Sequence, residues 1–148
     1  MTTLRDIIDN SVHQEYSTAA GSRTQRLLQH INIDAPRDAD AALCAHIKSM
    51  PHLAKFFGPN SRAEVPVAGT VRGRFISRRI DRMVIDDASR RVQILDYKTD
   101  VNRDERRAEY ANQITEYVML LRQIYPDYDV RGYILWLHDW TCEEIIVR

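Results

Sequence analysis

The sequence predicts a single α/β domain in which a central mixed sheet is flanked by helices. Three observations support this fold class. Apolar residues recur at helical spacing before residue 58, short segments rich in Val and Ile follow between residues 63 and 97, and helical spacing returns over residues 105–124. The length of 148 residues, with 44% apolar and 28% charged residues, is typical of one globular domain over residues 1–148.

The N-terminal part is predicted to be helical. Leu4, Ile7 and Ile8 have helical spacing, Ser22 can cap the next helix, and Pro51 ends a later one. The expected elements are a lead-in helix in residues 1–20, helices over residues 23–31 and 41–49, and a helical turn over residues 52–57.

The remainder is predicted to form strands around one long helix. Gly69, Gly73 and the segment 86–90 separate the Val- and Ile-rich segments from one another. An apolar stripe defines the long helix, which ends before Pro126. We expect strands over residues 63–68, 70–76, 80–85 and 91–97, the long helix over residues 105–124, and closing strands over residues 130–138 and 142–147.

The charge of the chain is balanced, with 21 basic and 21 acidic residues, so net charge does not indicate a nucleic-acid partner. Arginines nevertheless cluster between residues 72 and 91, which is typical of either a phosphate-binding surface or a solvated strand face. Arg72, Arg74 and Arg82 are the candidates for contacts with a nucleic-acid backbone, and the alternative for Arg82 is an ion pair with a neighbouring carboxylate.

Several classes of protein are disfavoured. Cys44 and Cys142 are too few for an iron–sulfur cluster or a cysteine zinc site. No apolar run reaches the roughly 20 residues that cross a membrane, and the N-terminus lacks a signal-peptide core, so we expect a cytoplasmic protein without a membrane partner. Because no GxxxxGK[ST] motif occurs, we do not expect ATP hydrolysis by that mechanism.

The segment VQILDYKT places charged residues within an apolar strand, where an unpaired carboxylate is costly. Asp96 and Lys98 are two residues apart, so their side chains point to the same face of a strand. Asp81 lies on the preceding strand. A hairpin turn centred on Ala88–Ser89 would set Asp81 directly opposite Asp96, with Cβ atoms about 5 Å apart.

Two carboxylates at this separation repel each other unless a proton or a cation lies between them. Mg²⁺, for which Mn²⁺ can substitute, takes oxygen ligands and retains several waters, which suits Asp81 and Asp96. Lys98 would orient a nucleophilic water and stabilise the charge of a phosphate transition state. The alternative is that Lys98 only neutralises Asp96 or Asp100 in an ion pair.

The combination of Ile80–Arg82 with Ile94–Thr99 resembles the RecB-type nuclease domain of the PD-(D/E)XK superfamily, in particular the C-terminal nuclease domain of bacterial AddA helicase–nucleases. The resemblance runs from about Gly21 to the C-terminus and implies a restriction-endonuclease-like core. It also implies that Asp81 and Asp96 bind metal, and it assigns further roles to Lys98 (catalytic lysine), Tyr97 (a metal ligand through its main-chain carbonyl), and Gln113 and Tyr117 (the supporting QxxxY motif). Without it, Gln113 and Tyr117 would be interpreted as an ordinary half-buried helical pair.

Two residues depart from the family pattern. Gln25 occupies the position of a metal-binding histidine, and its amide oxygen is a weaker ligand for transition metals, although acceptable for Mg²⁺. Arg78 stands where the family commonly has Gly. Glu64 falls where related nucleases have an acidic residue near a second metal position, and the alternative is a solvent-facing glutamate on an edge strand.

The expected function is Mg²⁺-dependent hydrolysis of DNA, as an exonuclease or endonuclease acting on single strands in double-strand break repair and recombination. The resemblance implies that the chain is the C-terminal module of a larger protein of the bacterial cytoplasm, with helicase domains upstream and an AddB-like partner subunit. One alternative is a nuclease-like module that binds DNA or a partner without cutting. Another is a purely structural α/β domain.

Overall fold

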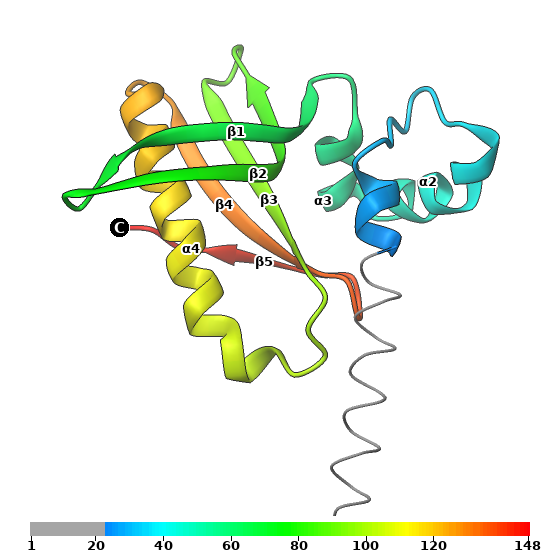
Figure 1. Ribbon diagram of the computed structural model, residues 1–148. Coiled ribbons are helices and arrows are strands. Elements are labelled where there is room, and N and C mark those ends of the chain that lie inside the picture. The colour runs from blue at the N-terminus through cyan, green and yellow to red at the C-terminus, as the bar shows by residue number, and fades with distance from the viewer. Residues whose placement is uncertain (1–22) are drawn as a thin grey trace, which may run out of the picture.

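The computed structural model describes residues 23–148 and contains a five-stranded sheet of order β1-β2-β3-β4-β5 (Figure 1). The first three strands form an antiparallel meander. The long helix then crosses over, so that β3 and β4 run parallel, and β5 pairs antiparallel with β4. The bounds are β1 Ser61–Val71, β2 Arg74–Asp86, β3 Arg91–Lys98, α4 Arg103–Ile124, β4 Asp129–Trp136 and β5 Thr141–Ile145. The predicted mixed α/β architecture is confirmed.

Short helices precede the sheet, as η1 Asp38–Asp40, α2 Ala41–Lys48, α3 Pro51–Ala54 and η2 Lys55–Phe57. Residues 23–28 are also helical, and this helix is shorter than predicted because residues 29 and 30 form a turn. The lead-in helix predicted in residues 1–20 lies outside the described residues. Among residues 23–148, no helix is long and apolar enough to cross a membrane.

Helices cover both faces of the sheet: α4 packs on one face, and the N-terminal helices pack on the other (Figure 1). The core under α4 contains Ile94 and Ile114, whereas the opposite core contains Leu28, Phe57 and Leu95. Neighbouring residues of β3 therefore point into different cores, as expected for a strand buried on both sides. The even-numbered side chains of β3 face α4.

Two predicted strand breaks are wrong. The break expected between residues 76 and 80 does not occur, because β2 runs unbroken through it, and the break at Gly69 is misplaced. Gly69 was expected to separate two strands, but it lies inside β1, and the chain instead turns at residues 72–73. The residues expected to form one strand over 70–76 are thus divided between β1 and β2, where Thr70 pairs with Phe75. Gly69 has a packing role, because a Cβ atom there would lie 2.4 Å from Leu120 Cδ1 on α4.

Gly132 on β4 likewise allows a close approach of α4. A Cβ atom at this position would lie 2.4 Å from Ile114 Cγ2 and 3.0 Å from Val118 Cγ2. We expect Gly132→Ala to lower the free energy of unfolding by about 1–3 kcal/mol, because α4 must shift away from the sheet. Urea unfolding measures this effect. Gly58→Ala is the control, since its nearest neighbour lies 4.0 Å away, and an equal loss in both variants would contradict the packing argument.

Candidate active site

The predicted register of the β2–β3 hairpin is confirmed. Asp86 pairs with Arg91 and Arg82 pairs with Leu95, and one further step in this register sets Asp81 opposite Asp96. The backbone ladder ends at this point. Instead, the Tyr97 N–H donates to Asp81 Oδ2 at 2.7 Å, which holds the Asp81 carboxylate at the edge of β3.

The two aspartates form an acidic pair that is largely removed from water. Asp96 is 5% exposed, and its Oδ2 lies 2.8 Å from Lys98 Nζ as an ion pair. That oxygen has no partner with hydrogen-bond geometry among residues 23–148. Burial and the neighbouring charge of Asp96 raise the pKa of Asp81 to about 7. The single positive charge of Lys98 therefore does not balance the negative charge of the two aspartates when both are ionised.

A third carboxylate, that of Glu64, lies near this pair. Glu64 falls opposite Asp81 in the β1–β2 register, but the pair is missing from the ladder, and Glu64 has a φ of 54°. Such a backbone irregularity redirects side chains. The charge of Glu64 contributes to the raised pKa of Asp81, and Gln29 Nε2 donates to Glu64 Oε1 at 3.0 Å. Sequence reasoning missed Gln29.

Helix α4 holds Lys98 in place. Lys98 Nζ donates to Gln113 Oε1 at 2.9 Å, and Gln113 Nε2 donates to the Tyr117 hydroxyl at 2.9 Å. The ammonium also lies 4.2 Å from the centroid of the Tyr110 ring. Tyr110 was missed in the sequence, although it is three residues before Gln113 and so on the same helix face.

The ion pair of Lys98 is with Asp96. Asp100, the other partner considered from the sequence, instead accepts a hydrogen bond from the Tyr110 hydroxyl at 2.7 Å. The environment of Tyr117 is consistent with this arrangement, because burial and the charges of Asp96 and Asp81 raise the pKa of its hydroxyl to about 12. Gln113 therefore links Lys98 to Tyr117 on the α4 side of the acidic pair.

The available ligands suit a hard divalent cation. Among residues 23–148, no group of three or more His, Cys, Asp or Glu side chains gathers into a metal site. One backbone oxygen can act as a further ligand beside the two aspartates. The Tyr97 carbonyl points to the same side of β3 as the Tyr97 N–H, toward Asp81. The Lys98 carbonyl faces β4 instead and accepts a hydrogen bond from the Leu137 N–H. Mg²⁺ needs few protein oxygens because it retains water.

Gln25 lies on the helix of residues 23–28 and is half-buried. Within the described part of the chain, it makes no hydrogen bond to the acidic residues, whereas Gln29, one turn later, reaches Glu64. A metal-binding role for Gln25 remains a prediction.

The structure contradicts the expectation that Arg82 contacts DNA. Arg82 is 4% exposed, and its Nη2 donates to the carbonyls of Leu28 and Ile31, the latter at 2.9 Å. Its guanidinium also lies 4.8 Å from the centroid of the Phe57 ring. Leu28 ends the helix of residues 23–28 and Ile31 follows the turn after it, so Arg82 joins the C-terminal end of this helix to β2.

We expect Arg82→Met to lower the free energy of unfolding by roughly 2–4 kcal/mol, because two buried carbonyls lose a charged donor. Urea unfolding tests this expectation. The control is Arg62→Met, an exposed position on β1, where the change should stay within about 0.5 kcal/mol. Similar losses in the two variants would rule out a buried structural role for Arg82.

The other two arginine candidates are exposed. Arg72 lies at the β1–β2 turn with a φ of 52°, nine residues before Asp81 along the chain. Arg74 forms an ion pair with Glu116 on α4. Contacts of either residue with DNA remain predictions.

Residues 4–139 match the family described as the PD-(D/E)XK nuclease superfamily. No curated protein shows significant similarity to the sequence.

Proposed function

The chain belongs to the PD-(D/E)XK nuclease superfamily, and from this premise we propose that it is a divalent-metal-dependent deoxyribonuclease. The sheet with helices on both faces agrees with a restriction-endonuclease-like fold. The observation that carries the proposal is the position of Lys98, whose ammonium lies 2.8 Å from Asp96 and is held by Gln113 beside the acidic pair.

The proposed reaction is hydrolysis of a phosphodiester bond. Asp81, Asp96 and the Tyr97 carbonyl would hold Mg²⁺, or Mn²⁺ in its place. When bound, the cation supplies Lewis-acid polarisation of the phosphate and activation of water. Lys98 donates a hydrogen bond to the attacking water and stabilises negative charge that develops on the phosphate. Gln113 accepts from Lys98 and thereby fixes the direction of its remaining N–H bonds.

The biological context is part of the proposal. The Ile80–Arg82 and Ile94–Thr99 motifs, which resemble those of AddA-type enzymes, support single-stranded DNA as substrate and a role in double-strand break repair and recombination. In that context the domain would work in the bacterial cytoplasm, together with helicase domains of a longer chain and an AddB-like subunit.

The second candidate function is a nuclease-like module that binds DNA or a partner subunit without cutting. It is favoured by Gln25, which stands where the resemblance places a metal-binding histidine and makes no hydrogen bond to the site among the described residues. Gain of cleavage in Gln25→His would show that this departure had weakened the enzyme.

The test is cleavage of an end-labelled single-stranded oligonucleotide by the wild type, with and without the partner subunit, in Mg²⁺, Mn²⁺ or EDTA. We expect cleavage that requires a cation and is lost in Asp96→Ala. Absence of cation-dependent cleavage by the wild type under all these conditions would favour the binding module. Cleavage that persists in Asp96→Ala would place the active site elsewhere.

A further inference from the structure

Arg78 differs from its neighbours on β2 in having no internal counterion. The guanidinium groups of Arg74 and Arg79 lie beside carboxylates of α4 and β1, respectively. Arg78 is exposed and forms no ion pair with any residue of the described range 23–148. Its one hydrogen bond there is to the neighbouring Ser77 carbonyl, at 3.1 Å. Its charge is therefore available to a ligand.

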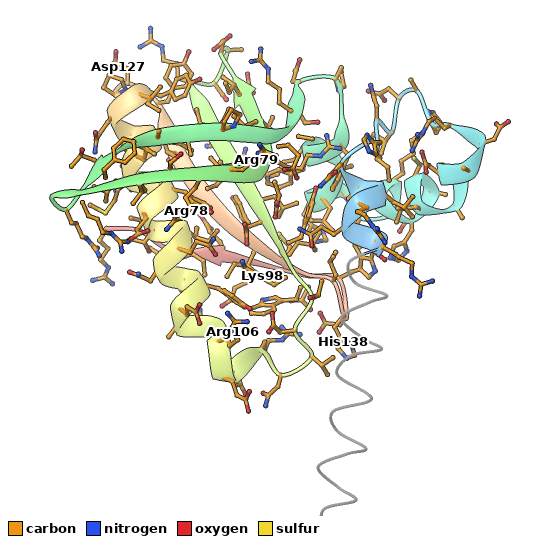
Figure 2. All side chains as sticks on the ribbon, viewed as in Figure 1. Arg78, Arg79, Lys98, Arg106, Asp127 and His138 are labelled. Atoms are coloured by element: carbon orange, nitrogen blue, oxygen red, sulfur yellow. The ribbon has the colours of Figure 1, made fainter. Side chains whose placement is uncertain are left out.

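Two observations place Arg78 on the α4 face of β2, within electrostatic reach of the candidate site. Ile76 and Ile80, the residues two positions before and after it, are both buried in the core under α4, so Arg78 lies on the same face of β2. Its charge also counteracts the rise in the pKa of Tyr117 that Asp96 and burial cause, so its guanidinium lies within electrostatic reach of that hydroxyl. Figure 2 shows Arg78 beside α4.

The negative charge of the acidic pair makes a nearby positive group useful for binding a nucleic-acid strand. A nucleic-acid strand brings phosphates to either side of the one that reacts, and these are repelled by Asp81, Asp96 and Glu64. A guanidinium binds a phosphate through two parallel hydrogen bonds and remains charged at all working pH values. Because Arg78 forms no internal ion pair within the described residues, no such pair has to be broken when its guanidinium binds a phosphate.

We propose that Arg78 binds a backbone phosphate of the substrate strand adjacent to the phosphate that is cleaved. This inference rests on the proposed nuclease function and extends it with a substrate contact that is specific to this chain. The contact is with the backbone and so carries no base preference. It replaces Arg82, which is buried, as the expected arginine contact near the site.

The test compares Arg78→Gln, Arg78→Lys and Arg90→Gln. Arg90 is the matched control, since it is also exposed and without an ion pair in the described residues, but lies at the β2–β3 turn. We expect Arg78→Gln to raise the KM for a single-stranded oligonucleotide roughly fivefold to tenfold. Arg78→Lys should recover part of this loss, and Arg90→Gln should stay within about twofold of the wild type.

Binding is measured separately from cleavage, with a fluorescein-labelled oligonucleotide, the Asp81→Asn background and a series of salt concentrations. Adding Arg78→Gln should reduce the slope of log affinity against log salt by about 0.7, as expected for one lost contact with a single strand. Adding Arg90→Gln should not change the slope.

The outcomes separate the two proposals. If the wild type cuts DNA but Arg78→Gln matches Arg90→Gln in KM and salt slope, the Arg78 inference is overturned. If the wild type does not cut but the salt slope depends on Arg78, the phosphate contact is supported and the nuclease proposal fails. Thermal unfolding of each variant verifies folding, which should be unaffected because Arg78 makes no side-chain contacts that the core requires.

Discussion

Lys98→Ala should reduce the rate of DNA cleavage about 10³-fold while the fold is retained, because the variant loses the one ammonium that lies against Asp96. The loss is expected mainly in kcat, since Lys98 is half-buried and is held by Gln113 rather than directed at solvent. Single-turnover cleavage with saturating enzyme measures this step directly.

The chain contains a well-matched control for this experiment. Lys55 also donates to a glutamine, Gln93, at 2.6 Å and lies 5.3 Å from the centroid of an aromatic ring, that of Tyr133. Gln93 is odd-numbered on β3 and so points away from α4, to the face opposite the site. Lys55→Ala should leave kcat within about twofold of the wild type. Equal losses in the two lysine variants would refute a catalytic role for Lys98.

Asp81→Asn should abolish cleavage and, at the same time, stabilise the metal-free protein at pH 8. The pKa of Asp81 is raised from 3.8 to about 7 because its site excludes water and Asp96 carries the same charge. A carboxyl group with a raised pKa holds its proton more tightly in the folded state, so ionisation destabilises the fold. The neutral amide avoids this cost, and its oxygen can still accept from the Tyr97 N–H.

The sign of this effect defines its pH window. Well below pH 3.8 the carboxyl is protonated in both the folded and the unfolded state, so the stabilities of wild type and variant should differ least there. The wild type should lose stability as the pH rises from 3.8 to about 7, and at pH 8 Asp81→Asn should be more stable than the wild type by up to about 4 kcal/mol. Unfolding in urea at a series of pH values, in EDTA, measures the difference.

Addition of Mg²⁺ extends this measurement. The cation should raise the Tm of the wild type at pH 8 more than at pH 5, because it binds the ionised carboxylates, and it should have little effect on Asp81→Asn. Asp127→Asn is the control, since Asp127 lies far from Lys98 (Figure 2) and should respond to Mg²⁺ like the wild type. An equal Mg²⁺ response in all three proteins would show that no cation binds at Asp81.

The strands were predictable where side-chain patterns are strong and less so where packing sets the boundary. The segment 91–97 was predicted within one residue of β3, because an apolar run bounded by polar turns leaves few alternatives. The break at Gly69 was predicted wrongly, because a glycine that allows a close approach of α4 has the same sequence signature as one that ends a strand. Only the position of Leu120 distinguishes the two.

The candidate site shows the same division. The opposition of Asp81 and Asp96 was predictable because hairpin register is a local property, determined by the turn at residues 87–90. The surroundings of these residues were not. Gln29 and Tyr110 approach the site only because separate helices pack on opposite faces of the sheet. Arg82 was misassigned because an arginine in a charged segment is usually exposed, and the two carbonyls that it contacts belong to residues more than 50 positions earlier in the chain.

The sequence by itself determined the α/β class, the hairpin that pairs Asp81 with Asp96, and the placement of Lys98 on the same strand face, because these depend on residue spacing within a short stretch of chain. Tertiary structure alone decided which groups surround them. It brought Glu64 across from Asp81, held Lys98 against Gln113, buried Arg82 and left Arg78 unpaired. These outcomes depend on contacts between elements far apart in the chain, and no local spacing encodes them.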